Sequence, residues 1–362
     1  MGLFTFGTSN TSVGVDIGTS SVKVIQLKKN PTGPEVIGYG ISPLPQGAME
    51  EGNIKDAPSI VAVIKELLKN AKIKPERSFA SISGQNVIMR FTKLPKMTPD
   101  ELEQTVRIEA EQYVPYAIEE VSITHAVLQD LVDEEGGGKS SILLVVAQKE
   151  LVNSYMDILK QSGVGTEAID VDTIAALNAL ETSIKQTADS QEGGEVVAVI
   201  DAGARTTNIS VLKASTLMFT RNIPIAGNNI TQMIMNVMKQ EFDQAEQIKV
   251  TEAEINIGGG TENEVSEVVR TTVEELSSEI RRSFDYFKAQ SREPLIHRII
   301  LSGGTANLKG FNTYLSNELG VDVYMGNPLE GVAVTTSDTD SLYSNLQQFT
   351  VAIGLALRGA VE

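Results

Sequence analysis

The alternation of hydrophobic and polar positions predicts an α/β chain with two matching strand–turn–strand units. In Val13–Leu27 (VGVDIGTSSVKVIQL) an apolar run leads into a polar turn, and alternation resumes after it, which is typical of a β-hairpin. Val197–Leu212 (VAVIDAGARTTNISVL) repeats this pattern, with Asp201 in the place of Asp16, an offset of 185 residues. A repeat at half the chain length predicts two similar lobes, each with one hairpin.

Further helices and strands follow from the same patterns. Apolar residues spaced by three and four predict helices, and short alternating or β-branched runs predict strands. Thr98, Pro99 and Glu101 form a capping box that opens one helix. The predicted helices are Ile60–Leu68, Glu101–Gln112, Leu151–Leu159, Ile169–Leu180, Gly227–Phe242, Glu262–Gln290, Leu308–Leu319 and Phe349–Arg358. The other predicted strands are Ser78–Ile82, Val87–Leu94, Val121–Asp130, Ser141–Ala147, Ile299–Leu301 and Val321–Tyr324.

The order of these elements predicts a first lobe that is interrupted by an insertion, followed by a second lobe. Residues 80–166 contain strands, a helix, two strands and a second helix, so we expect an inserted α+β subdomain there. The other predicted parts are the first lobe (10–79), its continuation with a hinge helix (167–196), the second lobe (197–348, with a helical subdomain at 227–290) and a C-terminal hinge helix returning to the first lobe (349–362).

Composition and charge exclude several classes of function. The 362 residues carry a net charge of −17, which argues against nucleic acid as the main partner. The chain has no cysteine, so it has neither a disulfide framework nor a thiolate metal site. Its two histidines, His125 and His297, are expected on the surface or in the core rather than in a metal site. With no signal peptide and no long apolar run, we expect a cytoplasmic protein that does not insert into the membrane.

The turns of the two hairpins carry the residues of a phosphate cradle. Gly18 lets the backbone turn sharply and lets an anion approach the peptide N–H groups. The hydroxyl groups of Thr19, Ser20 and Ser21 add donors, and Asp16 is placed to hold a metal ion through water. One such turn is a weak signal, because polar turns of this kind are common. Its recurrence at Asp201, Gly203 and Thr206 makes the interpretation stronger, since each hairpin then holds one side of a polyphosphate.

Three glycine turns in this order resemble those of the actin-like ATPase superfamily, which has a ribonuclease H-like, two-lobed fold. The two hairpins resemble its first and second phosphate motifs, LSGGTANLKG resembles its adenosine motif, and Asp172–Leu180 and Val351–Leu357 resemble its hinge helices. The inserted unit, the phrase IEAEQYVPY and the apolar-aromatic start resemble the PilM family of type IV pilus assembly proteins, which is related to FtsA. An FtsA-like protein would add an amphipathic tail, whereas this chain stops after the hinge helix, so FtsA is the second choice.

The superfamily resemblance implies a binding site for ATP and Mg²⁺ made of four groups of residues. The first phosphate site comprises Asp16, Gly18, Thr19, Ser20, Ser21 and Lys23, although strand alternation leaves the direction of Lys23 open. The second phosphate site comprises Asp201, Gly203, Thr206 and Thr207. Gly303, Gly304 and Thr305 face the adenosine, with Glu246 and Lys249 near the ribose and base and Ser283 beside the adenine. Asp16 and Asp201 are the metal residues, acting through water, because Mg²⁺ usually binds few carboxylates plus phosphates.

The second hairpin departs from the FtsA-type pattern, and the departures bear on activity. Ala204 and Arg205 replace glycines, and Asn208 stands where an aspartate is usual. A stiffer turn with one fewer carboxylate predicts at most a slow ATPase. Asp172 is a weak candidate for a catalytic base, because a role at the helix start explains it equally well.

The PilM resemblance implies an adaptor that binds, in a nucleotide-dependent way, the cytoplasmic tail of the inner-membrane protein PilN, which recruits it to the cytoplasmic membrane. Other pilus platform proteins and self-association are further expectations. For the groove that takes the tail we expect Val87–Leu94 and Glu101–Tyr113 as walls, with Arg90 and Gln112 as contacts; the alternative is two solvated side chains. A sugar-type kinase of the same fold is the competing interpretation, and it lacks a convincing catalytic aspartate.

Overall fold

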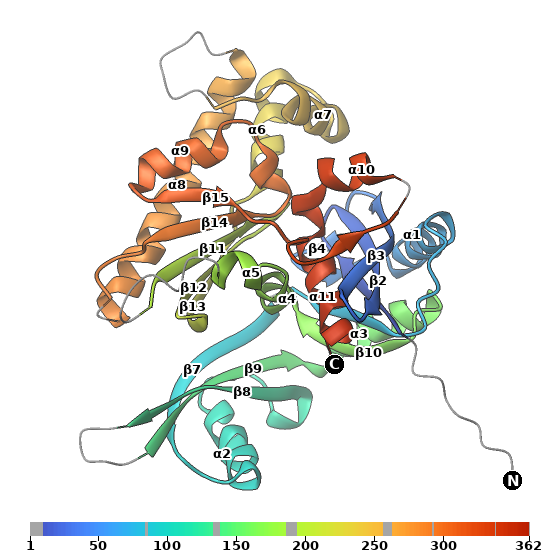
Figure 1. Cartoon of the computed structure of the whole chain (residues 1–362). Coiled ribbons are helices and arrows are strands. Elements are labelled where there is room, and N and C mark those ends of the chain that lie inside the picture. Colours follow the sequence, from blue (N-terminus) through green and yellow to red (C-terminus); the bar gives the residue numbers. More distant parts are fainter. Residues whose placement is uncertain are drawn as a thin grey trace, which may run out of the picture. The chain divides into compact units, whose positions relative to one another are not determined.

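Two compact units make up the chain in the computed structural model (Figure 1). The structure describes residues 10–83, 86–132, 138–185, 194–255, 263–291, 293–336 and 338–361. Unit 1 comprises Met1–Ile82, Asn153–Thr182 and Asn327–Glu362, and unit 2 comprises Ser83–Val152 and Ser183–Gly326.

A six-stranded sheet, in the order β10-β6-β1-β2-β3-β16, forms the centre of unit 1. The strands β1 and β2 and the strands β2 and β3 pair antiparallel, whereas β6 pairs parallel with both β1 and β10. Valines and isoleucines on β1 and β2 are buried, as expected for strands that are covered on both faces. The strands are β1 (Thr11–Ile17), β2 (Ser21–Asn30), β3 (Gly33–Pro43), β6 (Ser78–Ile82), β10 (Thr166–Val171) and β16 (Ala333–Val334).

Helices from distant parts of the sequence cover the sheet of unit 1. The C-terminal helix α11 (Thr350–Val361, red in Figure 1) packs against β1, β2 and α4. Helix α1 (Ala57–Asn70) packs against β3 and buries Ile60, Ile64 and Leu67. The smaller elements of this unit are α4 (Asp172–Ala179), β4 (Met49–Glu50), β5 (Asn53–Ile54), α10 (Thr339–Ser344) and η5 (Leu346–Phe349).

Unit 2 repeats this arrangement with a second sheet. Its five strands lie in the order β13-β12-β11-β14-β15, with antiparallel pairs on one side of β11 and parallel pairs on the other. Each strand therefore has a counterpart in unit 1, since β11 corresponds to β1, β12 to β2 and β14 to β6. The predicted duplication of the lobes is confirmed by this shared topology. The strands are β11 (Val196–Ala202), β12 (Thr207–Lys213), β13 (Thr216–Ile223), β14 (Arg298–Ser302) and β15 (Asp322–Met325).

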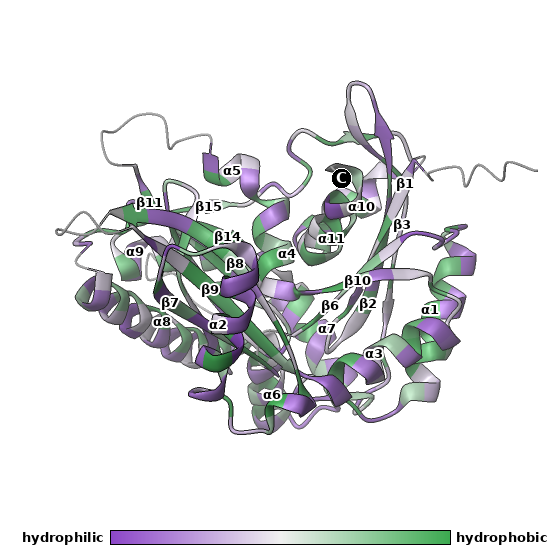
Figure 2. Ribbon diagram, turned by 90° about the horizontal axis from the view of Figure 1, so that it is seen from below, coloured by the Kyte–Doolittle hydropathy of each residue, from purple (hydrophilic) through white to green (hydrophobic). Residues whose placement is uncertain are grey.

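The long helix α8 (Glu264–Ser291) supplies much of the core of unit 2. The buried apolar residues of α8 recur every three or four positions, so they share one face, and hydrophobic and hydrophilic segments alternate along the helix in Figure 2. Its buried Leu276, Ile280 and Phe284 join the core formed by β11, β12 and β14. Among the described residues, every helix is too short or too polar to cross a bilayer. The remaining elements are α6 (Gly227–Met238), α7 (Phe242–Glu252), η4 (Gly304–Asn307), α9 (Phe311–Leu319) and α5 (Glu181–Lys185).

The inserted part has a sheet of its own, in the order β7-β9-β8, within unit 2. Helix α2 (Pro99–Glu111) packs on this sheet through Leu102, Val106 and Ala110. The capping box of Thr98 and Glu101 is confirmed, since each side chain bonds the backbone of the other residue. The elements are β7 (Val87–Pro95), η2 (Ile118–Glu120), β8 (Val121–Val132) and β9 (Gly138–Gln148), followed by α3 (Lys149–Gln161).

Two sequence predictions differ from the structure at the borders of this inserted part. The expected subdomain of residues 80–166 includes the end of β6 and the start of β10, but both strands lie in the six-stranded sheet, where they pair with each other. The separate sheet therefore begins only at Val87. For the same reason the helix predicted from Ile169 begins at Asp172, because Thr166–Val171 pairs with β6 as a strand.

Candidate phosphate-binding half-sites

The first hairpin holds an aspartate and a lysine directly opposite each other. Asp16 is the penultimate residue of β1, Lys23 lies across from it on β2, and the ammonium nitrogen is 3.2 Å from Oδ2 of Asp16. Both side chains are about nine-tenths buried, with 12% and 11% of their surface exposed. The backbone N–H of Gly18 donates to the carbonyl of Ser21 at 3.1 Å and closes the turn. The cation therefore lies at the turn itself, which suits a phosphate group.

The other predicted residues of this turn differ in exposure. Ser20 is exposed and Thr19 is half-buried, so both hydroxyl groups are accessible at the tip. Ser21 is buried. A residue beyond the hairpin also fixes the turn, because the N–H of Leu44 donates a hydrogen bond to the carbonyl of Ser20 at 2.9 Å.

A buried tyrosine on α3 lies near the acidic residues of the first half-site. The hydroxyl of Tyr155 donates to the carbonyl of Gly52 at 3.2 Å, and its side chain is almost fully buried. Burial, with the negative charges of Asp172 and Asp16 nearby, raises the pKa of Tyr155 above its usual value. Asp172 accepts hydrogen bonds from the N–H and hydroxyl of Thr173, at 2.6 and 3.2 Å, as the first residue of α4. Asp16, Asp172 and Tyr155 thus lie in one electrostatic neighbourhood of unit 1.

The second hairpin has the same turn with a different residue opposite the aspartate. The N–H of Gly203 donates to the carbonyl of Thr206 at 3.0 Å, as Gly18 does in the first hairpin. Asp201 lies across from Asn208, which occupies the position of Lys23. The amide oxygen of Asn208 accepts from the amide of Asn222 at 2.7 Å, and Asn208 is buried. In the first hairpin the residue across from the aspartate is therefore a lysine, which neutralises the charge of Asp16. In the second hairpin the residue at that position is an uncharged amide.

The adenosine-type turn of unit 2 packs directly on the second phosphate turn. The hydroxyl of Thr305 donates to the carbonyl of Gly203 at 2.7 Å, across 102 residues of sequence. Gly303 has a φ of +87°, and a Cβ there would lie 2.3 Å from the carbonyl oxygen of Ala202. A side chain at this position would collide with the backbone of β11, so the close approach of the two turns requires glycine. Gly304 is exposed beside it.

Lys249 and Glu246 lie next to this pair of turns, and their assignment to the ribose and base stays a prediction. The ammonium of Lys249 donates to Glu246 at 2.6 Å, to the hydroxyl of Thr231 at 3.0 Å and to the carbonyl of Gly227 at 3.2 Å. A Cβ on Gly227 would lie 2.6 Å from the hydroxyl of Thr305 and 3.3 Å from this ammonium. The start of α6, the helix α7 and both glycine turns therefore meet in one cluster of polar groups.

Burial changes the acidity of Lys249 within this cluster. It lowers the pKa of Lys249, and the negative charge of Glu246 and its hydrogen bond oppose that effect. Only 13% of the Lys249 side chain is exposed, against 39% for Glu246. The carboxylate is therefore the member of the pair that reaches solvent and can accept a hydrogen bond from a ligand hydroxyl.

Two of the predicted site residues have other contacts. The hydroxyl of Thr207 donates to the carbonyl of Ile225 at 2.7 Å and is buried. Ser283 is fully buried on α8, where its hydroxyl donates to the carbonyl of Glu279 and accepts from Arg221 of β13 at 3.2 Å. These contacts explain both hydroxyl groups as parts of the core, and the assignment of Ser283 to the adenine stays a prediction.

Sequence reasoning missed three residues of the half-sites, namely Tyr155, Gly227 and Thr231. In the sequence, Tyr155 occupies one apolar position of an amphipathic helix, and no local pattern predicts a contact for its hydroxyl. Gly227 and Thr231 fit an ordinary helix start. Their roles depend on contacts with Thr305 and Lys249, which lie far away in the sequence.

Carboxylates for a metal ion are sparse in the part of the chain that the structure describes. No group of three or more histidine, cysteine or acidic side chains that could hold a metal ion is present there. His297 has a backbone role, since its Nδ1 accepts from the N–H of Val196 at 3.0 Å. Asp16 and Asp201 each offer one carboxylate beside a phosphate-type turn, which fits Mg²⁺ that arrives with a nucleotide rather than an ion held by the protein alone.

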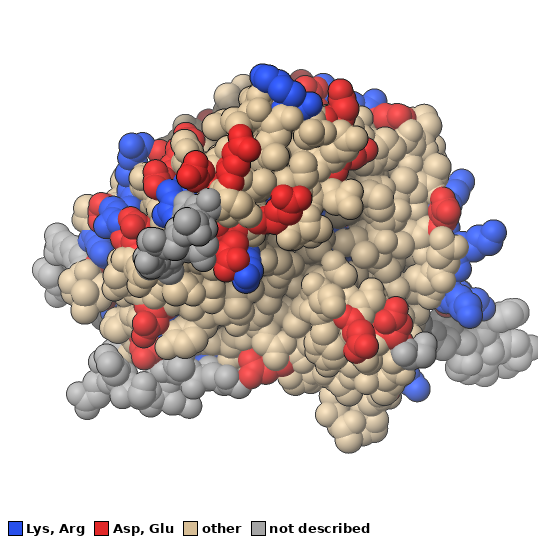
Figure 3. Space-filling model, turned by 90° about the horizontal axis from the view of Figure 1, so that it is seen from above, with Lys and Arg blue, Asp and Glu red and all other residues tan. Residues whose placement is uncertain are grey.

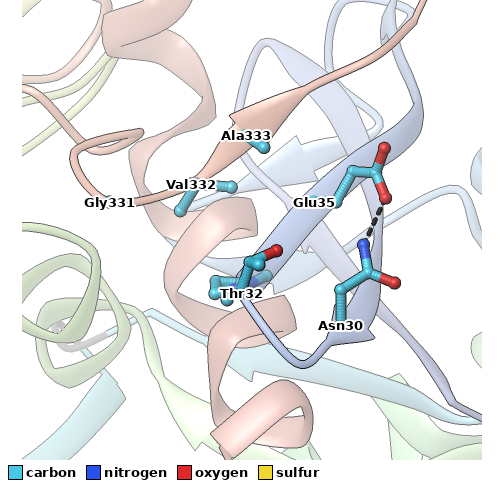
Figure 4. Close-up of a pocket in the computed structure, with 8 residues that line it drawn as sticks. Asn30, Thr32, Glu35, Gly331, Val332 and Ala333 are labelled. Carbon is cyan, nitrogen blue, oxygen red and sulfur yellow. Dashed lines mark hydrogen bonds between the residues drawn. The ribbon is translucent and has the colours of Figure 1, made fainter.

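A hollow of about 480 Å³ in unit 1 lies away from the first phosphate turn (Figure 4). It lies between the β2–β3 turn and β16, where the amide of Asn30 donates to the carboxylate of Glu35. Its lining consists of Asn30, Thr32, Gly33, Pro34, Glu35, Gly331, Val332 and Ala333, none of which belongs to the predicted nucleotide site.

The two predicted contacts for a partner lie close together on the inserted part. The guanidinium carbon of Arg90, on β7, lies 4.9 Å from the ring centroid of Tyr113, which is a cation–π contact. Gln112, the residue before that tyrosine, caps the end of α2. Arg90, Gln112 and Tyr113 are all exposed. The structure thus shows an exposed arginine–tyrosine pair where β7 meets the end of α2.

Comparison with known proteins gives a family and a fold. The family model described as type IV pilus assembly protein PilM matches residues 14–360. A solved PilM–PilN type IV pilus biogenesis complex contains a chain similar to this one, with a TM-score of 0.85 and 29% identity over 96% of this chain and 98% of that chain.

More distant relatives share the fold. The cell division protein FtsA of Escherichia coli K12 is 23% identical over 95% of this chain and 89% of its own length. EutJ of Carboxydothermus hydrogenoformans has a TM-score of 0.56 at 16% identity, covering 96% of this chain and 89% of that one. MreB5 of Spiroplasma citri, solved with AMPPNP, has a TM-score of 0.54 at 11% identity, covering 96% and 95%. The predicted actin-like fold is confirmed by these likenesses and by the duplicated sheets.

Proposed function

Because this chain belongs to the PilM family of type IV pilus assembly proteins, we propose that it is a nucleotide-loaded adaptor of the pilus assembly platform. In this proposal ATP binding switches the protein into the state that binds the cytoplasmic tail of a PilN-type membrane protein. The single observation that supports it most is the pair of matching phosphate-type turns in a chain of this family.

In this proposal the two half-sites bind different parts of the nucleotide. In unit 1, the N–H groups and hydroxyls of residues 18–20 and the ammonium of Lys23 bind phosphate oxygens. In unit 2, the turn at Gly203 binds phosphate, and the Gly303–Thr305 turn with Glu246 binds the nucleoside. A carboxylate with 39% of its surface exposed suits a ribose hydroxyl, which needs an acceptor.

Magnesium enters with the nucleotide in this proposal. It would neutralise phosphate charge, and Asp16 and Asp201 would orient it through water. Both carboxylates lie beside a phosphate-type turn, and we expect the loss of Asp201 to reduce the Mg²⁺ dependence of nucleotide binding.

The proposed partner is the PilN tail, on the strength of the similar PilM–PilN complex. A tail that is disordered when free loses entropy on binding, so the surface must bury its apolar anchors and bond its backbone. The exposed side chains of Arg90, Tyr113 and Gln112 offer a cation, an aromatic face and an amide for such contacts. This partner would recruit a cytoplasmic protein to the inner face of the membrane. Binding to other platform proteins and self-association are compatible extensions of this role.

Turnover of ATP should be slow. Switching needs a bound nucleotide and not a high rate of hydrolysis, and the second turn carries Asn208 in place of an acidic group. Asp172 is the candidate that would orient an attacking water, since it lies at the start of α4 in the electrostatic neighbourhood of Asp16.

The experiment for nucleotide binding is thermal unfolding with and without Mg²⁺-ATP. A ligand that binds only the folded protein stabilises it by about 2.7 kcal/mol at a hundredfold excess over Kd. Asp201→Ala should reduce this gain, and Asp243→Ala, an exposed carboxylate at the start of α7, is the matched control. An unchanged melting curve of the wild-type protein at millimolar Mg²⁺-ATP counts against the nucleotide site.

Two alternatives predict different results in simple assays. An FtsA-like division protein is favoured by the FtsA likeness over nearly the whole chain, and it would bind FtsA partners instead of a PilN tail. A sugar-type kinase would raise its ATP turnover in the presence of a sugar. The adaptor should turn over slowly and should not respond to sugars.

A further inference from the structure

We propose that a basic surface on unit 1 binds the anionic headgroups of a phospholipid membrane. The surface consists of Lys28 at the end of β2 and of Lys65, Lys69, Lys72 and Lys74 at and beyond the end of α1. All five side chains are exposed, in a chain whose net charge is −17. Figure 3 shows Lys and Arg side chains gathered at the edge of unit 1, where α1 lies in Figure 1. We name these five residues the lysine surface.

The fold brings the five lysines onto one side of unit 1. Lys65 and Lys69 are one helical turn apart and share the outer face of α1. After the helix, the chain packs on β3, where a Cβ on Gly38 would lie 3.2 Å from the side chain of Ile73. Lys72 and Lys74 flank that contact. Lys28 lies across from Glu35 in the register of β2 and β3. Glu35 is three residues from Gly38, or roughly 10 Å along the strand.

The five ammonium groups form no close ion pair among the described residues. In the described part of the chain, none of the five lies within 4 Å of a carboxylate, in contrast to Lys23, Lys96 and Lys249, which are ion-paired. Glu66 and Glu76 lie in the same stretch of sequence and are exposed. Hydrogen bonds from Thr335 and Asn30 are the main causes of the lowered pKa of Glu35, and the positive charge of Lys28 opposite it adds to them. The five lysines therefore outnumber the three acidic residues that lie among them, Glu35, Glu66 and Glu76.

The shape and chemistry favour a membrane over a discrete ligand. All five groups are lysines, which are point charges on flexible stems, and arginines would suit bidentate recognition of one anion better. The hollow beside β16 is lined by none of them. Exposed Ile37, on β3 between Glu35 and Gly38, adds an apolar contact that can enter the headgroup layer. Clusters of four to eight basic residues bind anionic bilayers with about 1 kcal/mol for each lysine, or roughly fivefold in affinity.

The lysine surface would give the protein a second, weak attachment to the membrane, independent of nucleotide and of a partner's tail. Two weak contacts with one membrane raise the effective concentration of each. This proposal goes beyond the adaptor function and does not depend on it, so each can fail without the other.

The experiment is co-sedimentation of the full chain with vesicles. Vesicles of phosphatidylcholine with about one-third phosphatidylglycerol are compared with pure phosphatidylcholine at low and at physiological salt, where the Debye length falls to about 8 Å. We expect binding only to the anionic vesicles, and weaker binding at the higher salt. In a variant with Lys65, Lys69, Lys72 and Lys74 each changed to glutamine, we expect the partition coefficient to fall at least tenfold.

The matched control changes four exposed lysines of unit 2, Lys93, Lys139, Lys239 and Lys309, to glutamine, and should keep the partition coefficient within about twofold. If the quadruple variant does not melt cooperatively, Lys65→Gln with Lys69→Gln on the solvent face of α1 replaces it, with an expected loss of at least fivefold. Three results would overturn the proposal: no binding of wild-type protein to anionic vesicles at low salt, equal binding of the variant, or an equal loss in the control. Binding to polyglutamate or duplex DNA but not to vesicles would identify an acidic macromolecule instead.

Discussion

Lys23 lies directly across the first hairpin from Asp16, with 3.2 Å between the ammonium nitrogen and the carboxylate oxygen, and both side chains are nearly buried. The equivalent pair in the second hairpin is Asn208 and Asp201. Two turns with the same backbone closure therefore differ in the residue across from the aspartate, which is a lysine in the first and an amide in the second. This difference gives the first prediction.

Lys23→Met should lower the free energy of unfolding by about 3 kcal/mol, because it leaves the carboxylate of Asp16 buried and unpaired. The double variant Asp16→Asn, Lys23→Met should recover most of that loss, since the unpaired charge is gone. Urea unfolding measures both. Lys28→Met, at an exposed position of the same strand, is the control and should change stability by less than about 0.5 kcal/mol. Equal effects of Lys23→Met and Lys28→Met would show that the buried pair does not form.

Gly303→Ala should destabilise the protein far more than Gly320→Ala. Both glycines have a positive φ, +87° and +67°, so each substitution strains the backbone by about 1 kcal/mol or more. At Gly303 a Cβ also collides with the carbonyl of Ala202, whereas nothing lies within 4 Å at Gly320. We expect a difference of at least about 2 kcal/mol in urea unfolding. Equal losses would mean that the two turns of unit 2 are not in close contact.

The lowered pKa of Lys249 predicts a dependence of stability on pH. Because the folded protein holds this proton less tightly than the unfolded chain, the unfolded chain binds more protons just below the ordinary pKa of 10.5. The free energy of unfolding contributed by Lys249 therefore rises with pH in that window. Lys249→Met should remove the rise, whereas Lys309→Met, on a largely exposed side chain, should keep it. Parallel pH profiles of the wild type and Lys249→Met from pH 8 to 10.5 would contradict the burial of this ammonium.

Tyr155→Phe should cost about 1 kcal/mol, because the carbonyl of Gly52 loses its donor inside the unit. The raised pKa of Tyr155 adds a second signature. Its stabilising effect is complete below the ordinary value of 10.0 and is lost as the pH rises above it, because the unfolded chain ionises first. Denaturation of the wild type and Tyr155→Phe between pH 9 and 11 tests both effects. Tyr343→Phe, at an exposed site, should change neither.

Local pattern was enough to predict the hairpins and several helices. Asp16, Gly18 and Ser21 lie within six residues, and the alternation on both sides of them predicts an antiparallel hairpin. The structure has this hairpin. The capping box at Thr98 and Glu101 is equally local. The direction of Lys23 was open from the sequence, because it depends on the register of the hairpin and not on residue type.

Non-local pairing explains what the sequence did not predict. The strands β3 and β13 were missed, since Gly33–Pro43 is rich in glycine and proline and becomes a strand only by pairing with β2. The apolar spacing of Ile169–Val171 fits a helix as well as a strand, so the sequence predicts a helix there. Pairing with β6 makes this segment a strand. The meeting of Gly227, Thr305 and Lys249 likewise follows from packing between distant elements.

The partner surface can be tested by one change at the exposed pair on the inserted part. Arg90→Ala should weaken binding of a PilN-type tail peptide by about tenfold, as arginines beside aromatic rings often dominate such contacts. Arg282→Ala, on the exposed surface of α8, should leave it unchanged. Isothermal titration measures both, and equal affinities for all three proteins would move the binding surface elsewhere.

The most direct test of the adaptor function is calorimetric titration of that tail peptide into the full chain with Mg²⁺-ATP, with Mg²⁺-ADP and without nucleotide. We predict that Mg²⁺-ATP strengthens binding at least fivefold, a coupling of about 1 kcal/mol, and that Asp201→Ala abolishes the difference. A ligand shifts the equilibrium between two states only by its differential affinity for them. The same affinity under all three conditions, in a protein shown to bind ATP, would contradict nucleotide-dependent recognition of the tail.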